Sequence, residues 1–284
     1  MFEIIYRYDP DYCGERRMPV DATDACRRLE EGNQSFATLA SGAVSGSRIV
    51  YMDITSFGMG GVSAHKPFAV VLGPADARVP TEMIFDRTSN EMFVVRVAGN
   101  IISEELLGSI DYAVQHLGES LKLIVVLGHS QCGAVRAAVN AFLTPSEYLG
   151  FSTFHHLRSI INILFPAVRG AVQEALSIRW GDEVTKPPGY HGAVIEFSVL
   201  MNAALMASIL RSKFDDPATD RRIVFGVYDL ASRRVHVCVP PENGHEPSIR
   251  LREAPMGGKQ FRTFAYQVAS SAFITRLLHQ EEEK

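Results

Sequence analysis

Residues 121–136 read LKLIVVLGHSQCGAVR, and their pattern gives the strongest indication of the fold class. Its first part is a nearly continuous apolar run rich in β-branched side chains, which is typical of a strand buried on both faces of a parallel sheet. The run ends at Gly128, and residues 134–143, AVRAAVNAFL, then have the pattern of a helix. A buried strand that turns directly into a helix predicts an α/β protein, with His129 and Cys132 in the turn.

Two similar apolar runs precede this stretch, FAVVLG at 68–73 and MFVVRV at 92–97. Between the second run and residue 121 lies SEELLGSIDYAVQHLG (103–118), which predicts an amphipathic helix that Ser103 can cap and Gly118 can close. A strand, a helix and a second strand in this order form a βαβ crossover. We therefore expect a mostly parallel sheet flanked by helices.

The chain divides into three parts by pattern. Residues 1–63 predict an N-terminal extension with a helical arm in DATDACRRLEEGNQSF (21–36), capped by Asp21 or Thr23, and a short strand in RIVYMDI (48–54). The apolar stripe of the arm has no partner nearby in the sequence, so we expect it to pack on a second protomer. Residues 64–240 predict an α/β core that ends with a helix at 194–214 and a hairpin of RIVFGVYDL and RRVHVCVP (222–240). Residues 241–284 predict a C-terminal helical extension.

Composition limits the partners. The chain has 284 residues, 46% hydrophobic content and a formal net charge of -4, which gives no electrostatic reason to expect nucleic acid. Its four cysteines are too sparse for a disulfide framework, so a reducing compartment fits. The N-terminus has no leader pattern and no window reaches the roughly 18 apolar residues of a membrane span, so we expect a cytoplasmic protein without a membrane partner.

His129 and Cys132 lie at the carboxyl end of a predicted strand, where the sites of parallel α/β proteins gather. A helix N-terminus stabilises a thiolate, and thiolate and imidazole are zinc ligands. A lone histidine and cysteine at this spacing also recur by accident, as a packed thiol beside a histidine that is bonded to a backbone carbonyl. Spacing alone therefore leaves both interpretations open.

A neighbouring strand end offers charged side chains. The run FAVVLG is followed by PADAR (74–78), so Asp76 and Arg78 stand at an edge that converges with the turn at 129–132. As a surface ion pair they would contribute roughly 0 to 1 kcal/mol. Their location at a second strand end favours a functional role.

Together these stretches resemble a known protein family. HKPFAVVLGPADARVPTEMIFD, FVVRVAGNIISEELLGSIDYAVQHLG and LKLIVVLGHSQCGAV resemble the β-class carbonic anhydrases in order and spacing, and EEGNQSF is similar to their N-terminal arm. The resemblance covers roughly residues 21–240 and is weakest over 141–192. It implies an oligomer, a homodimer or larger, and a Zn²⁺ ion held by two cysteines and a histidine, with water or an aspartate as the fourth ligand. It also implies a dyad in which the aspartate of the C-x-D-x-R motif accepts a hydrogen bond from zinc-bound hydroxide.

The family residues match at Asp76, Arg78, His129 and Cys132, but Pro74 stands where the family has its first cysteine. Proline has no metal-binding atom. By resemblance, the remaining metal ligands are His129, Cys132 and a compensating Asp76, and the catalytic dyad is Asp76 with Arg78. Since Asp76 cannot both bind zinc and serve the dyad, we expect weak or absent zinc and little CO₂ hydration.

Three interpretations follow. The first is a protein that keeps the fold and an anion pocket for bicarbonate or another small anion, used as a scaffold, sensor or partner subunit. The second is an altered zinc lyase that acts on CO₂ or a related small electrophile through Asp76, His129 and Cys132. The third is that the natural residue at position 74 is cysteine.

Overall fold

In this computed structural model, the described residues are 2–8, 18–40, 46–52, 64–151, 153–172, 187–237 and 251–280. Within them, the core is a six-stranded sheet of order β4-β3-β5-β6-β7, with β8 paired to β6 off this path. β3, β4, β5 and β6 run parallel, and β7 and β8 run antiparallel to β6. The bounds are β3 (Ala69–Pro74), β4 (Met92–Val97), β5 (Leu123–His129), β6 (Arg222–Tyr228), β7 (Val235–His236) and β8 (Arg252–Glu253).

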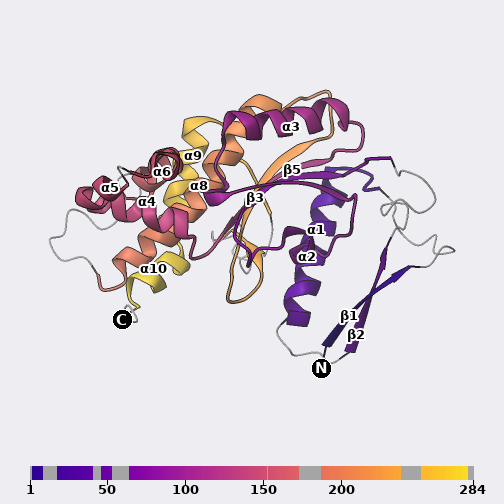
Figure 1. The fold of residues 1–284 in the computed structure, drawn as a ribbon, viewed down its shortest axis with the longest axis horizontal. Helices are drawn as coiled ribbons and strands as arrows, with labels where there is room; N and C mark the ends of the chain where they lie inside the picture. The colour runs from indigo at the N-terminus through magenta and orange to yellow at the C-terminus, as the bar shows by residue number, and fades with distance from the viewer. Residues whose placement is uncertain are drawn as a thin grey trace.

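Helices cover both faces of this sheet, which confirms the expected α/β fold (Figure 1). One face carries α1 (Ala22–Ala40) and the short α2 (Thr81–Ile84). The opposite face carries most of the other helices, including those of the C-terminal extension. They are α3 (Glu104–His116), α4 (Gly133–Leu143), α5 (Pro145–Gly150), α6 (His155–Arg169), α8 (Tyr190–Phe214), α9 (Gly257–Ala269) and α10 (Ala272–Leu278).

The two-sided cover explains the apolar runs in the sequence. In β5, Ile124 and Val126 belong to the cluster beneath α3, α4 and α8, while Leu123 and Val125 belong to the cluster beneath α1. Successive side chains of a strand point to opposite faces, so a strand covered on both sides needs an apolar residue at nearly every position.

Helix α8 crosses the middle of the core. It is long and apolar enough to cross a membrane, with a mean hydropathy of 1.9 in its most apolar window, so the expectation that no window reaches this level was wrong. However, 78% of that window is buried inside the molecule. A helix that is apolar on all sides is either a core helix or a membrane span, and the burial identifies α8 as a core helix.

The expected helices are present, and the predicted cap of α1 is confirmed, whereas that of α3 is not. Asp21 caps α1, since its Oδ1 accepts a hydrogen bond from the Asp24 N–H at 2.7 Å. Ser103 precedes α3 without a capping hydrogen bond from its side chain, and α3 ends at His116, two residues before Gly118. The hairpin of β6 and β7 is confirmed.

Helix α1 packs on the sheet of its own chain, which corrects the expectation that its apolar stripe packs on a second protomer. Leu29 is fully buried in the cluster beneath this helix. The Asn33 side chain donates to the Ile84 carbonyl at 3.2 Å and accepts from the Val235 N–H at 2.7 Å. A Cβ at Gly32 would lie 1.9 Å from the Phe85 carbonyl oxygen, so this close approach requires glycine. The partner of the stripe is thus far away in sequence.

A second, two-stranded sheet lies beside α1, apart from the main sheet (Figure 1). It pairs β1 (Phe2–Tyr8) with β2 (Gly46–Met52) in parallel. β2 overlaps the strand expected at 48–54, whereas β1 lies in a stretch for which the sequence indicated no structure.

Candidate metal centre

The candidate residues meet at the carboxyl edge of two adjacent strands. β3 and β5 pair in parallel, with Val71 opposite Val125, so the residues after Leu72 and Val126 emerge at the same edge. Asp76 follows β3 and His129 ends β5. His129 Nε2 lies 3.8 Å from Asp76 Oδ2.

Asp76 is held by Arg78 through three hydrogen bonds. Arg78 Nε donates to Asp76 Oδ1 at 3.0 Å, Nη2 donates to Oδ2 at 2.7 Å, and the Arg78 backbone N–H donates to Oδ1 at 2.8 Å. The hydrogen bonds from the Arg78 side chain have the largest effect on the pKa of Asp76, which is lowered to about 2. The Asp76 side chain is thus an ionised carboxylate, and both of its oxygens already accept hydrogen bonds from Arg78.

His129 is a buried, neutral imidazole whose orientation is fixed. Its Nδ1 lies 2.9 Å from the Ser130 carbonyl oxygen, which can only accept, so Nδ1 carries the proton. Nε2 then has the lone pair and lies toward Asp76. Burial lowers the pKa of His129, against the opposite effect of the Asp76 carboxylate.

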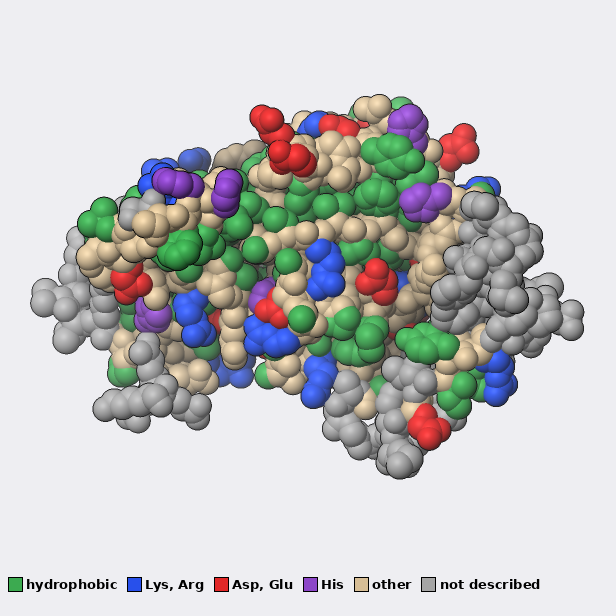
Figure 2. Space-filling view, viewed as in Figure 1, with side chains coloured by type: hydrophobic (Ala, Val, Ile, Leu, Met, Phe, Trp, Pro, Cys, Tyr) green, Lys and Arg blue, Asp and Glu red, His purple; other side chains and the backbone are tan. Residues whose placement is uncertain are grey.

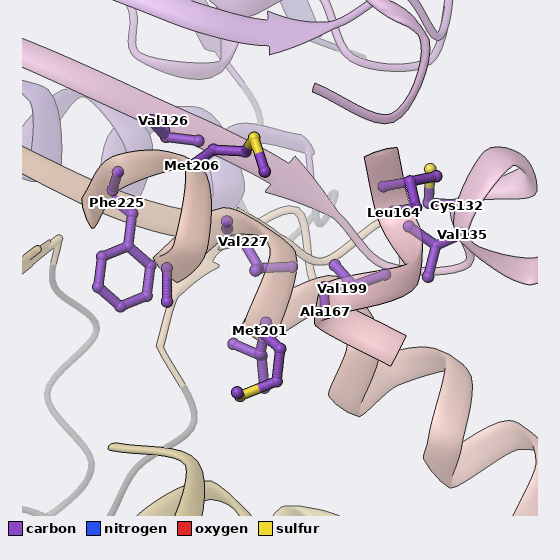
Figure 3. Packing of buried hydrophobic residues seen from close by; sticks show 14 of the residues in the cluster. Val126, Cys132, Val135, Leu164, Ala167, Val199, Met201, Met206, Phe225 and Val227 are labelled. Carbon is purple, nitrogen blue, oxygen red and sulfur yellow. The ribbon is translucent and has the colours of Figure 1, made fainter. Parts of the chain in front are cut away.

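Cys132 occupies the N-cap position of α4 and is 3% exposed. Figure 3 shows it among apolar side chains, close to Val135 and Leu164. This burial raises the pKa of the thiol above its ordinary value, although the N–H groups of Val135 and Ala134 act in the opposite direction. The expectation that the helix N-terminus favours thiolate is therefore only partly correct, because burial has the larger effect in the free protein.

Pro74 is buried at the end of β3, and Arg96 fixes the turn that follows it. The Arg96 guanidinium donates to three backbone carbonyls, those of Pro74 at 2.9 Å, Asp76 at 2.6 Å and Val79 at 3.1 Å. The turn that carries Asp76 and Arg78 is thus tied to β4. Sequence reasoning missed this role of Arg96, and the only available signal was its place in the RVAGN stretch.

The AGN segment at 98–100 forms a close turn beneath the site. Gly99 has a φ of 71°, which glycine adopts without strain, and a Cβ there would lie 3.3 Å from Ala134 Cβ. Asn202 of α8 donates to the Gly99 carbonyl at 2.8 Å. Glycine at position 99 therefore permits both this backbone conformation and the close approach of α4.

Glu196 of α8 holds the turn between His129 and Cys132 from the other side. Its Oε1 accepts from the Gln131 N–H at 2.7 Å, and Gln131 has a φ of 55°. Burial raises the pKa of Glu196 to about 7, with a further contribution from Asp229. A cavity of about 170 Å³ opens beside this turn; its lining includes Glu196, Asp229, His236 and Phe273.

These residues do not fit a zinc ion in the observed arrangement. Within the described residues, no three His, Cys, Asp or Glu side chains are placed to hold a metal ion together. Both oxygens of Asp76 are used by Arg78, and Pro74 supplies no ligand atom. Asp76, Arg78 and His129 are nevertheless brought together, with Cys132 close enough that the charge of Asp76 affects its pKa.

Comparison with known proteins identifies the fold and family. A family model described as carbonic anhydrase matches residues 69–208. Carbonic anhydrase 2 of Mycobacterium tuberculosis is 44% identical over 156 residues, which are 54% of this chain and 67% of that protein. Carbonic anhydrase of Mycolicibacterium smegmatis is 44% identical over 105 residues, which are 37% of this chain and 48% of that protein.

Among solved structures, the β-carbonic anhydrase CcaA superposes with a TM-score of 0.51 at 18% identity and covers 75% of this chain and 87% of its own. At this identity the likeness supports the fold alone. The sequence identity to the mycobacterial protein and the matching family model extend the agreement from fold to family. The chain therefore belongs to the β-class carbonic anhydrase family.

Proposed function

We propose that this family member has a degenerate zinc site, hydrates CO₂ slowly or not at all, and acts as a scaffold, sensor or partner subunit. The main support is that both carboxylate oxygens of Asp76 bind the Arg78 guanidinium, beside Pro74, which has no ligand atom. To replace the absent cysteine as a ligand, Asp76 would have to give up three hydrogen bonds and leave Arg78 without its partner. Losing the orienting groups of a metal site costs about 10- to 100-fold in affinity or activity.

The proposed ligand is CO₂, bicarbonate or another small anion. Asp76 uses Nε and Nη2 of Arg78, and the Arg78 side chain is 56% exposed, so its remaining N–H groups are open to an anion. We also propose a cytoplasmic location, on the cysteine usage described above, and no nucleic-acid or membrane partner.

The proposed assembly is a homodimer or a larger homo-oligomer. β4 stands at the edge of the main sheet in the described part of the chain, and its residues from Phe93 to Val95 are only half-buried. Phe93 contacts the ring of Tyr112, which is exposed on α3. Figure 2 shows apolar side chains and histidines together on the face that carries α3. An apolar edge of this kind is a surface on which a second chain can pack.

Metal analysis tests the proposal. We expect well under one zinc per chain after dialysis against a chelator, and CO₂ hydration by stopped flow close to the uncatalysed rate. The M. tuberculosis carbonic anhydrase 2 treated in parallel serves as the positive control. Stoichiometric zinc together with rapid hydration would overturn the proposal.

One observation favours the alternative of an altered zinc lyase. His129 Nε2 is free of the Ser130 hydrogen bond and lies 3.8 Å from Asp76 Oδ2, so these two possible ligands already lie close together beside the turn that carries Cys132. If this alternative holds, zinc stays bound to the parent protein during dialysis against a chelator, and the Asp76→Asn variant loses it. Under the primary proposal, the zinc content of Asp76→Asn equals that of the parent.

A further inference from the structure

The two-stranded sheet of β1 and β2 is incompletely covered. Figure 1 shows it beside α1, and apart from pairing with each other neither strand has an extensive contact with another described element. Ile5 of β1 pairs with Ile49 of β2, so these two side chains share a face, and both are exposed. Tyr6, on the other face of β1, is 59% exposed.

Such a pair of strands needs a partner. Parallel sheets occur almost only where both faces are covered, and a two-stranded sheet alone is at best marginally stable in water. β1 pairs with β2 on one side only, and in the described part of the chain no strand pairs with its other edge. Within the described residues, the backbone donors and acceptors of that edge are therefore available to another strand.

The charges of β1 indicate what the partner is. Glu3 and Arg7 are the charged residues of this strand, both are exposed, and neither has an ion-pair partner among the described residues. They stand two positions before and two positions after Ile5. If a second β1 runs antiparallel with Ile5 opposite Ile5, each Glu3 lies opposite an Arg7 of the other chain. No other antiparallel register pairs these charges.

We propose that β1 is a self-association strand, which pairs antiparallel with β1 of a second copy about a two-fold axis at Ile5. The product is a four-stranded sheet of order β2-β1-β1-β2. A two-fold contact requires a surface that is complementary to itself, and the arrangement Glu3, Ile5, Arg7 meets this requirement. Directly opposite residues of opposite charge stabilise an antiparallel pair, and like charges destabilise it. The proposal concerns a contact other than the β4 edge and does not rest on the state of the zinc site, so its failure would leave the proposed function unchanged.

Cysteine cross-linking of the full chain tests the register. In Ile5→Cys, the two new thiols lie directly opposite each other, at the Cα separation of about 4.5 to 5.5 Å that a disulfide can bridge. In Tyr6→Cys, the neighbouring exposed residue, the two copies are offset along the strands by two residues and are too far apart. We expect a disulfide-linked dimer on a non-reducing gel for Ile5→Cys, and only the background of the parent for Tyr6→Cys. Equal cross-linking of both variants, or none of Ile5→Cys, would overturn the proposal.

Charge reversal provides the second test, within the Ile5→Cys background so that only contact between the β1 strands is measured. Glu3→Arg or Arg7→Glu alone places like charges opposite each other at both symmetry-related positions, and should slow cross-linking roughly tenfold. The combined Glu3→Arg/Arg7→Glu variant restores both pairs and should cross-link at the unmodified rate. A combined variant as slow as the single ones would contradict the pairing.

Discussion

Pro74 occupies the last position of β3, where its side chain is buried and its carbonyl accepts a hydrogen bond from Arg96. The pairing of β3 with β5 ends at Leu72, so that ladder does not need an N–H from position 74. Proline is therefore tolerated here, although strand interiors usually exclude it. The Arg96 hydrogen bond uses the backbone carbonyl, so a cysteine at position 74 can keep it.

Restoring cysteine at position 74 should recover zinc and activity. In Pro74→Cys we expect zinc near one per chain and CO₂ hydration roughly tenfold or more above the parent, because Asp76 can then stay with Arg78. Metal analysis and stopped-flow hydration at equal zinc loading measure this. The matched controls are Pro74→Ala, which relaxes the backbone without adding a ligand, and Pro74→Cys/Cys132→Ala. If Pro74→Cys binds zinc but is as slow as the double variant, the defect extends beyond the ligand.

The titration of Asp76 reports on its bond to Arg78. The folded pKa of Asp76, about 2, lies below its ordinary value near 4, so the pair stabilises the fold above about pH 4 and this stability is lost as pH falls toward 2. Arg78→Ala should raise the pKa of Asp76 and remove this part of the pH dependence. Carboxyl NMR of Asp76 and urea midpoints from pH 5 to 2 measure both effects, with Arg87→Ala as the control. An ordinary pKa for Asp76 in the parent would contradict the observed geometry.

The residues of the site could be found from sequence only where they follow strand ends. Asp76, His129 and Cys132 do, and the order of strands brings them to one edge. Arg96 could not be found in this way, because its partners are backbone carbonyls that have no sequence signature. The effect of burial on the Cys132 pKa could not be predicted from sequence either, because it depends on which helices enclose the thiol.

At the scale of elements, β3, β4 and β5 were predictable because strands covered on both faces must be apolar throughout. β1 was missed because it is not covered, so its FEIIYRY sequence mixes charges with apolar residues. The docking of α1 was mispredicted since its contacts with Ile84 and Val235 join residues about 50 and 200 positions apart. Periodicity identifies an amphipathic face and does not identify what covers it.

The C-terminal helices are structural parts of the core, and α9 provides a test. Phe264 of α9 is 2% exposed and meets Phe225 of β6 edge-on, with ring centroids 5.3 Å apart. Phe264→Ala should lower the free energy of unfolding by about 3 to 5 kcal/mol. Tyr266→Ala, two residues away on the exposed face, should change it by about 0.5 kcal/mol or less. Denaturant unfolding of both variants compares them, and equal effects would mean that α9 is not docked on β6.

At the scale of the whole molecule, the main sheet is enclosed by segments from both ends of the chain. The family model matches residues 69–208, whereas α1 precedes this span and α9 and α10 follow it. α1 covers the face that contains Phe68, Val71 and Phe85, all of them almost fully buried. The core of this chain is thus completed by segments outside the matched span.

Deletion of residues 1–40 should therefore produce aggregation. Without α1, the side chains beneath it become a contiguous apolar surface of the kind that soluble monomers rarely expose. The single substitution Asn33→Asp is a milder test, because it keeps an acceptor for the Val235 N–H but loses the donor to the Ile84 carbonyl and buries a charge. Light scattering after size exclusion should show that the deletion variant aggregates. Denaturant unfolding should show that Asn33→Asp is less stable than the parent, whereas Gln34→Asp, on the exposed side of α1, is not. A deletion product that remains a folded oligomer of unchanged subunit number would mean that the sheet is stable without α1.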